Sequence, residues 1–226
     1  MRSRDRIAIG YTDPGTVDGR FASALFGLGV NRGQLFTTLI HQSGSMLARQ
    51  RNMIAAQFLD QTNAAWLLML DADVVLSIEA FDLLCATVHD QTRPVVSGLY
   101  FALGHGEPWP RPVPTLYRID AEGNHVPIFD YPANSIIEVE SAGAGCLIVH
   151  RSVLEAIRRD RPIDVGPEWC WFHEGPYAGG EGWIGEDLTF CNRIRAAGYP
   201  IHAHTGAVLP HHKAHWIAEA QYRANL

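Results

Sequence analysis

The sequence has no run of about 18 apolar residues, the length that a membrane-spanning helix needs. The apolar stretch 7–10 is too short for the core of a secretory signal. None of the four cysteines forms a CxxC pair, so we expect reduced thiols and a cytoplasmic protein. No long basic stripe is present and the formal charge is −6, which disfavours a protein that grips many nucleic-acid phosphates.

The composition is that of an ordinary globular protein, with 47% apolar and 19% charged residues. A chain of 226 residues can bury one sizeable core, so we expect one domain over 1–226. Short apolar runs alternate with helical stretches along the chain. This alternation predicts an α/β domain with a mostly parallel central sheet flanked by helices.

Individual elements follow from apolar spacing and from turn or cap residues. Strands are expected at 7–11, 66–70, 94–100, 145–150 and 199–204, and antiparallel β-structure at 115–140 with a turn at 122–124. Helices are expected at 44–59, after the N-cap Ser77, after a Ser152–Glu155 capping box, at 186–197 before Gly198, and in the tail from 213. Loops are expected at 104–114 and 164–185.

An acidic triplet follows the most apolar of these strands. Asp71 and Asp73 stand at the carboxyl end of that strand, where ligands bind in open α/β sheets. Two neighbouring carboxylates suit a hard cation such as Mg²⁺ or Mn²⁺, which a diphosphate would share. The alternative is that both are loop aspartates ahead of the next helix. Upstream, Arg49 and Asn52 share one helix face, which is either solvated or placed against phosphates.

A second acidic pair opens the helix at 186–197. Glu186 and Asp187 either cap that helix or include a general base for an acceptor hydroxyl. Trp183, in the glycine-rich loop before them, is suited to stacking on a sugar. Trp171 lies in the aromatic segment 169–173, which is either an acceptor-facing surface or a lid packed on the core.

Histidines crowd the C-terminal end of the sequence: His202, His204, His211, His212 and His215. Their spacing is not diagnostic of zinc. We therefore favour one of them as an additional ligand to a metal bound by the aspartates.

Four stretches, in order, resemble the GT-A glycosyltransferases, particularly small phage and bacterial members related to family 2. They are the Arg-Asn helix segment 49–53, the strand with its DxD triplet 66–74, the glycine-rich strand 143–151, and the Glu-Asp helix with its following strand and histidine, 185–199 and onward. The likeness spans about residues 5–215. It implies a GT-A domain with a nucleotide-binding half at about 5–100, an acceptor-side half at about 101–212 and a helical tail at 213–226.

The resemblance also implies roles for individual residues. Asp71 would contact the ribose or the metal, Asp73 would bind the metal, and His211 would be the third ligand, with His212 as the alternative. Asp187, or else Glu186, would be the base. Nucleotide contacts are expected from Tyr11, Thr12, Asp13, Arg49 and Asn52, and acceptor contacts from Gly145, Trp171 and Trp183.

The expected activity is metal-dependent transfer of a sugar from a nucleotide-diphosphate sugar, with Mn²⁺ or Mg²⁺ and a UDP- or GDP-sugar as donor. The acceptor is a hydroxyl of a protein, a glycan or a modified nucleobase, and a phage-encoded enzyme would act in the host cytoplasm. Two alternatives are a nucleotidyltransferase on a related fold and a non-catalytic carbohydrate-binding module. The first would favour a glycine-rich phosphate loop, for which 13–16 is a poor match.

Overall fold

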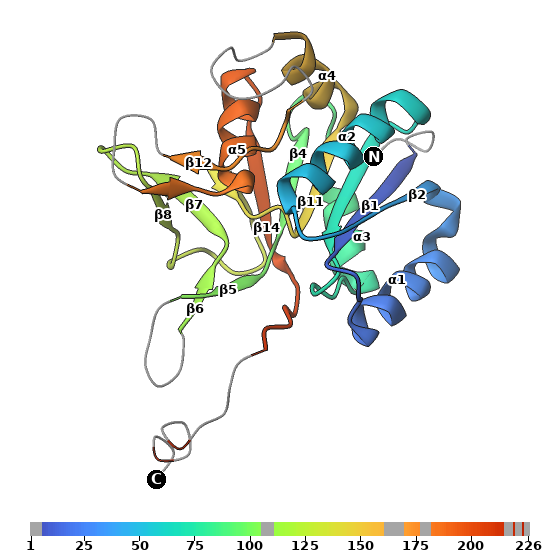
Figure 1. The fold of residues 1–226 in the computed structure, drawn as a ribbon, viewed down its shortest axis with the longest axis horizontal. Coiled ribbons are helices and arrows are strands. Elements are labelled where there is room, and N and C mark those ends of the chain that lie inside the picture. Colours follow the sequence, from blue (N-terminus) through green and yellow to red (C-terminus); the bar gives the residue numbers. More distant parts are fainter. Residues whose placement is uncertain are drawn as a thin grey trace.

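A seven-stranded sheet forms the centre of the protein in a computed structural model (Figure 1). The structure describes residues 6–104, 111–160, 170–176 and 182–214, together with Glu219 and Arg223. The strand order is β2-β1-β3-β11-β4-β14-β9. The strands are β1 (Ile7–Asp13), β2 (Phe36–Ser43), β3 (Trp66–Asp71), β4 (Val95–Leu99), β9 (Ile136–Val139), β11 (Cys146–His150) and β14 (Ile201–Val208).

Most of this sheet is parallel. Strands β2, β1 and β3 pair in parallel, as do β4 and β14. Strand β11 runs antiparallel to both β3 and β4, and β9 runs antiparallel to β14. Five strands therefore point the same way, and the predicted α/β class with a mostly parallel sheet is confirmed.

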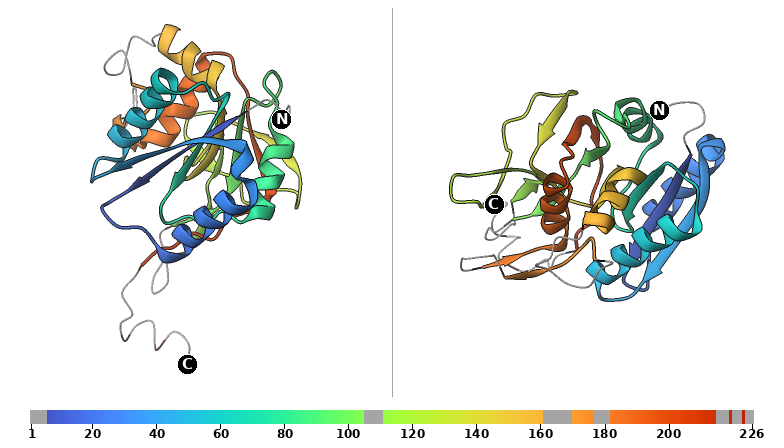
Figure 2. Two further views of the ribbon diagram at one scale, coloured as in Figure 1. Left: turned by 90° about the vertical axis from the view of Figure 1, so that its right-hand side faces the viewer. Right: turned by 90° about the horizontal axis from the view of Figure 1, so that it is seen from above.

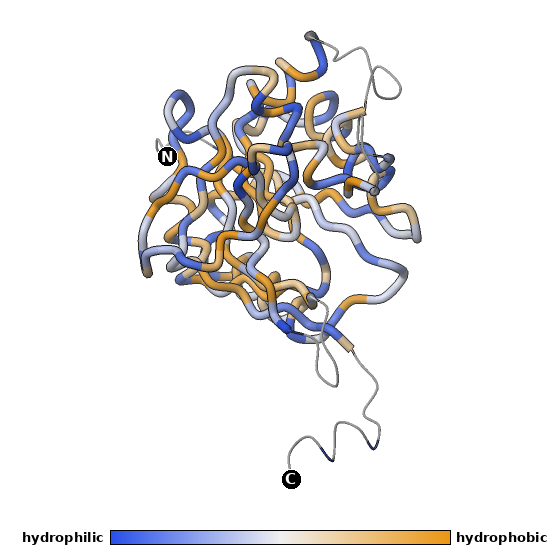
Figure 3. The backbone as a smooth tube through the Cα atoms, turned by 90° about the vertical axis from the view of Figure 1, so that its left-hand side faces the viewer, coloured by the Kyte–Doolittle hydropathy of each residue, from blue (hydrophilic) through white to orange (hydrophobic). Residues whose placement is uncertain are grey.

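Helices cover both faces of the sheet (Figure 2). One hydrophobic cluster packs one face against α2 (Leu47–Gln61), α4 (Arg151–Asp160) and α5 (Glu186–Ala196). A second cluster packs the other face against α1 (Gly19–Arg32) and α3 (Ile78–Thr87). Strand β3 is buried on both faces, and its side chains alternate between them: Leu67 and Met69 enter the first cluster, and Leu68 and Leu70 enter the second. Figure 3 shows hydrophobic segments running mainly through the middle of the molecule.

Smaller antiparallel sheets lie beside the main one. They comprise β10 (Ser141–Ala142), β7 (Leu116–Ile119) and β8 (His125–Pro127), then β5 (Phe101–Leu103) with β6 (Pro112–Pro114), and finally β12 (Gly175–Pro176) with β13 (Trp183–Ile184). The predicted antiparallel element at 115–140 is present, and Gly123 turns it at a φ of +87°. Residues 112–114 are strand β6 and not loop, because they pair with β5.

The predicted caps of helices α3 and α5 are confirmed, whereas the predicted N-cap of α4 is wrong. The Ser77 side chain accepts from the Ala80 N–H at the start of α3, and Gly198 follows α5 at a φ of +83°. Helix α4 begins at Arg151, directly after β11, so Ser152 is not its N-cap. Instead, the Nδ1 of His150 accepts from the Ser152 N–H.

The segment 16–43, for which no element was predicted, holds α1, the 3-10 helix η1 (Gly33–Leu35) and β2. Strand β2 is an edge strand with mostly exposed side chains, so it lacks an alternating apolar pattern. The tail from 213 lies mostly outside the described residues, so its predicted helix is not tested. Within the described part of the chain, no helix is long and apolar enough to cross a membrane.

The strand register brings the predicted site segments to one edge of the sheet. Thr12 pairs with Asp71, and Asp13 pairs with Ser43. The antiparallel β11 begins at this same edge, and the Gly145 carbonyl accepts from the Asp71 N–H at 3.0 Å. Residues far apart in sequence therefore meet where β1, β2 and β3 end.

Candidate active site

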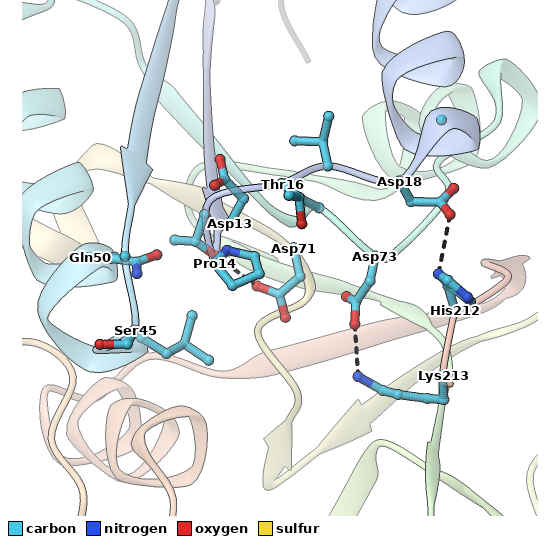
Figure 4. Close-up of a pocket in the computed structure, with 16 residues that line it drawn as sticks. Asp13, Pro14, Thr16, Asp18, Ser45, Gln50, Asp71, Asp73, His212 and Lys213 are labelled. Atoms are coloured by element: carbon cyan, nitrogen blue, oxygen red, sulfur yellow. Dashed lines mark hydrogen bonds and ion pairs between the residues drawn. The ribbon is translucent and has the colours of Figure 1, made fainter. Parts of the chain in front are cut away.

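A cavity of about 580 Å³ lies at this carboxyl edge of the sheet (Figure 4). Its lining comes from the loop after β1, the start of α2, the DxD triplet and the chain after β14. The lining residues are Thr12, Asp13, Pro14, Thr16, Val17, Asp18, Gly19, Gly44, Ser45, Leu47, Gln50, Asp71, Ala72, Asp73, His212 and Lys213. Of the predicted nucleotide and metal contacts, the cavity thus gathers Thr12, Asp13, Asp71 and Asp73.

At one end of the cavity, Asp13 is held by a hydrogen-bond network. Its carboxylate accepts from the Ser43 hydroxyl at 2.8 Å and the Gly15 N–H at 2.7 Å, and it contacts His41 Nε2. Burial raises the pKa of Asp13, but these hydrogen bonds outweigh burial and lower it. Tyr11 stacks on the His41 ring at 4.4 Å between centroids, and it supports this end without lining the cavity.

Asp71 is fixed by a buried arginine. Arg51 Nη2 donates to both Asp71 oxygens, at 2.7 and 2.9 Å, and Arg51 Nη1 donates to Glu186. Thr12 Oγ1 adds a hydrogen bond to Asp71 at 3.2 Å. The Arg51 side chain is only 4% exposed and lies over the Phe172 ring. Burial lowers the pKa of Arg51, yet Asp71 and Glu186 outweigh it and raise that pKa, so the guanidinium is a permanent cation.

Asp187, next to Glu186 at the start of α5, has a different environment. Burial, followed by the charge of Glu186, raises the pKa of Asp187 to about 6, although Arg51 opposes this shift. The only hydrogen bond to its side chain among the described residues comes from the Leu188 N–H, at 2.8 Å. A carboxylate with a pKa near the working pH is suited to general-base chemistry.

At the other end of the cavity, Asp73 is paired with side chains that follow β14. Its Oδ2 lies 2.8 Å from Lys213 Nζ and 3.3 Å from His211 Nε2. Burial raises the pKa of Asp73, but the hydrogen bonds from His211 and Lys213 outweigh burial and lower that pKa to about 2. His212 points away to Asp18, 3.1 Å from its Oδ2 (Figure 4). The neighbouring histidines thus face different acids, and His211 is the one beside Asp73.

The donor set at Asp73 fits a divalent cation. His211 Nδ1 donates to the Phe101 carbonyl at 2.7 Å, which leaves Nε2, 3.3 Å from Asp73 Oδ2, as the ring nitrogen that a cation could take in place of its proton. A second hydrogen bond of this kind commonly orients a metal-binding histidine. Among the described residues, no group of three or more His, Cys, Asp or Glu side chains is arranged to hold a metal, because Asp71 is turned to Arg51. Phosphate oxygens would therefore have to complete such a site.

Gly145 borders the buried side of Asp71. A Cβ at this position would stand 3.0 Å from Asp71 Oδ2 and 2.9 Å from the Tyr100 ring and hydroxyl. The Gly145 N–H donates to that hydroxyl at 2.9 Å. Gly145 thus permits close packing behind the DxD triplet, whereas its predicted acceptor contact stays a prediction.

Arg49, Asn52 and Trp171 are among the predicted site residues that do not line the cavity. Arg49 is exposed and does not line it. Asn52 is buried, and its amide accepts from the N–H groups of Trp171 and Phe172 and donates to the Phe172 carbonyl at 2.7 Å. Trp171 is fully buried, with its Nε1 donating to the Leu154 carbonyl. The predicted nucleotide contacts of Arg49 and Asn52 therefore receive no support from the cavity and stay predictions, and Trp171 packs on the core, which is the second of the two readings given for its segment.

Trp183 is the predicted aromatic residue that stays accessible, with 65% of its surface exposed. It lies in β13, three residues before Glu186. The segments 161–169 and 177–181 around it lie outside the described residues, as does His215.

Arg51 and Lys213 are site residues to which the sequence interpretation gave no separate role. Arg51 had a usable signal, because it falls on the apolar stripe of α2 with Leu47, Ile54 and Phe58. A charged residue on such a stripe needs a buried partner. Lys213 had no comparable signal, because it lies in the predicted tail and meets Asp73 only through the path of the chain after β14.

Comparison with known proteins supports the fold. No protein-family model and no curated protein sequence matches the chain. The structure of A197 from STIV is 20% identical, with a TM-score of 0.56, over 94% of this chain and 97% of that one. GalNAc-T7 with UDP, GalNAc and Mn²⁺ is 10% identical, with a TM-score of 0.52, over 91% of this chain but 43% of that one. A glycosyltransferase involved in glycosylation of the PBCV-1 major capsid is more distant, with a TM-score of 0.39. The chain therefore has a GT-A-like fold.

Proposed function

We propose that the chain is a metal-dependent glycosyltransferase, which moves a sugar from a nucleotide-diphosphate sugar to an acceptor hydroxyl. One observation carries this proposal: Asp73 lines the cavity where the parallel strands end, and its Oδ2 lies 3.3 Å from Nε2 of His211. That edge is where open α/β sheets bind ligands. The likeness of the fold to a structure of GalNAc-T7 with UDP, GalNAc and Mn²⁺ adds support.

The two ends of the cavity suit the two parts of such a donor. Asp73 and His211 would hold Mn²⁺ or Mg²⁺, which would neutralise the charge that develops on the leaving diphosphate. The nucleoside would then extend towards Thr12, Asp13 and the start of α2. Tyr11 would support that end through its stack on His41. We infer a UDP- or GDP-sugar as the donor class, without assigning the sugar.

The acceptor side of the proposed site is the start of α5. Asp187 would take the proton from the acceptor hydroxyl, because it combines burial with a pKa raised to about 6. Glu186 is engaged with Arg51, so it is less suited to that task. Trp183 offers an exposed indole face for a sugar ring. A protein, a glycan or a modified nucleobase would each provide the hydroxyl.

The carbohydrate-binding alternative receives less support. A carbohydrate-binding surface commonly uses exposed aromatic rings, but of the described tryptophans Trp66 and Trp171 are fully buried and only Trp183 is exposed. Such a module would also leave the half-buried Asp187, whose pKa is raised, with no chemical role.

Calorimetry with UDP and GDP, with and without Mn²⁺, tests the proposal. We expect binding that strengthens with Mn²⁺ in the wild-type chain and loses its Mn²⁺ dependence in Asp73→Asn. Asp82→Asn is the matched control, because Asp82 is an exposed aspartate paired with Arg32 outside the cavity. Nucleotide binding that ignores Mn²⁺, or an equal loss in both variants, would refute the metal assignment.

Turnover provides the second part of the test. Hydrolysis of a panel of UDP- and GDP-sugars identifies the donor, and the mass added to candidate proteins, glycans and modified nucleobases identifies the acceptor. Transfer of the nucleoside monophosphate group to an acceptor, with release of sugar 1-phosphate in place of a nucleoside diphosphate, would favour the nucleotidyltransferase alternative.

A further inference from the structure

The 226 residues contain a single lysine, Lys213, while the other 17 of the 18 basic residues (18 − 1) are arginines. Lys213 is also the only Lys or Arg side chain among the described residues that line the cavity. The one compact ammonium group of the sequence therefore stands at the proposed diphosphate end of the site.

The backbone around Lys213 is fixed. The His212 N–H donates to the Asp73 carbonyl at 2.8 Å, and the Val75 N–H donates to the Pro210 carbonyl at 2.9 Å. The chain after β14 thus pairs with the loop that carries Asp73. A fixed backbone leaves the four-carbon side chain of Lys213 as the part that can move.

The ion pair that Lys213 makes is accessible to solvent. Its Nζ is 2.8 Å from Asp73 Oδ2, and both side chains are 38% exposed. Exposed pairs of this kind contribute little and exchange readily. An arginine could hold a carboxylate with two parallel hydrogen bonds, whereas a lysine makes a point contact that is easily redirected.

The charges around the cavity indicate which group Lys213 Nζ would contact once a divalent cation and a diphosphate are bound. Lys213 contacts the same Asp73 oxygen that faces His211 Nε2, so a divalent cation there displaces it. The other acid beside it, Asp18, is 3.1 Å from His212. A diphosphate held by the cation then offers the nearest uncompensated negative charge.

We propose that Lys213 is an exchangeable cation, which neutralises Asp73 in the empty site and binds the diphosphate of the donor when a divalent cation takes Asp73. This inference rests on the proposed function. It assigns Lys213 a ligand, a phosphate group, and it makes cation binding and diphosphate binding mutually supportive. No covalent step is involved.

The single lysine allows a direct test by amine labelling of the intact chain, read by mass spectrometry. In the 226-residue chain used for the test, the other amine is its α-amino group, which serves as an internal control. We expect Mn²⁺ alone to speed labelling of Lys213 a few-fold, because Nζ leaves Asp73. We expect Mn²⁺ with inorganic pyrophosphate to slow it about 10-fold or more, while labelling of the α-amino group stays constant.

Two variants extend the test to binding, with Arg32→Met as the matched control at the exposed Arg32–Asp82 pair. Lys213→Met should bind Mn²⁺ alone a few-fold more tightly and pyrophosphate with Mn²⁺ about 10- to 100-fold more weakly, the usual value of a charge-assisted hydrogen bond. Lys213→Arg should restore part of the pyrophosphate affinity. Arg32→Met should change neither affinity.

The outcomes separate this inference from the proposed function. If the wild-type chain binds UDP or GDP with Mn²⁺, yet Lys213 is labelled at one rate in every condition, the exchange is overturned and the function stands. Weaker Mn²⁺ binding by Lys213→Met would also overturn the exchange. If the wild-type chain binds neither nucleoside diphosphates nor pyrophosphate, both proposals fall together.

Discussion

The two aspartates of the DxD triplet have opposite environments. Asp71 faces Arg51, whose side chain is 4% exposed and also holds Glu186. Asp73 faces Lys213 in a pair that is 38% exposed on both sides. A buried ion pair is costly to break, because the remaining charge is left without solvent, whereas an exposed pair is exchanged at little cost. The Asp71 end is thus a fixed support, and the Asp73 end is where a charged ligand can enter.

Of the changes that test this difference, Arg51→Met should have the largest effect, on the free energy of unfolding. It leaves Asp71 and Glu186 without their shared cation, so the free energy of unfolding should fall by about 3–5 kcal/mol. Lys213→Met should change it by at most about 1 kcal/mol. Urea denaturation of both variants measures the difference. Equal losses would mean that the two ends do not differ as described.

Asp187→Asn should have the next largest effect, on turnover. Removal of a general base slows a reaction by about 10²- to 10⁴-fold. Glu186→Gln should slow it less, since Glu186 serves as the partner of Arg51. Donor and acceptor turnover in both variants provides the test, and a slower Glu186→Gln than Asp187→Asn would reverse the two assignments.

The same pair predicts a pH effect. The charge of Glu186 raises the pKa of Asp187, so Glu186→Gln should lower that pKa below about 6 and move the acid limb of kcat to lower pH. A pH–rate profile measures the shift. Glu155→Gln, at an exposed arginine-paired glutamate on α4, is the control and should leave the profile in place.

The ionised form of Asp187, which turnover requires, should lower the stability of the folded protein. Because the folded pKa of Asp187 is raised from 3.8 to about 6, its charge destabilises the folded state above about pH 6, and protonation relieves this between pH 6 and 4. Asp187→Asn should therefore raise the melting temperature by a few degrees at pH 7.5 but not at pH 4. No gain at pH 7.5 would contradict the conclusion that the charge of Asp187 destabilises the folded protein.

The smallest expected effect is the salt dependence of the interaction between Lys213 and Asp73. A double-mutant cycle with Lys213→Met and Asp73→Asn measures the coupling energy between the two side chains. It should be about 0.5 kcal/mol at low ionic strength. In about 0.5 M salt it should fall to zero within the usual margin of such cycles, about 0.3 kcal/mol. The coupling between Arg51→Lys and Glu186→Gln should persist in salt, because Arg51 is buried and Glu186 is only 14% exposed. Salt-insensitive coupling at Lys213 would show that its pair is not exchangeable.

Much of the architecture could be predicted because it depends on local patterns. The apolar strand before Asp71, the Ser77 cap and the Gly198 terminator each lie within a few residues of the feature they define. The edge strand β2 was missed because its exposed side chains give no periodic signal. Trp171 was not distinguished from a surface aromatic residue, since its burial depends on Asn52, 119 residues away.

The sequence by itself determined the α/β class, the carboxyl edge as the place of the site, and the acids Asp71, Asp73 and Asp187 as its candidates. Only the tertiary structure decided how those acids are partnered. Arg51 reaches Glu186 across 135 residues and Lys213 reaches Asp73 across 140. Burial and charge pairing set the behaviour of a carboxylate, and both depend on neighbours that the chain brings together only when it folds.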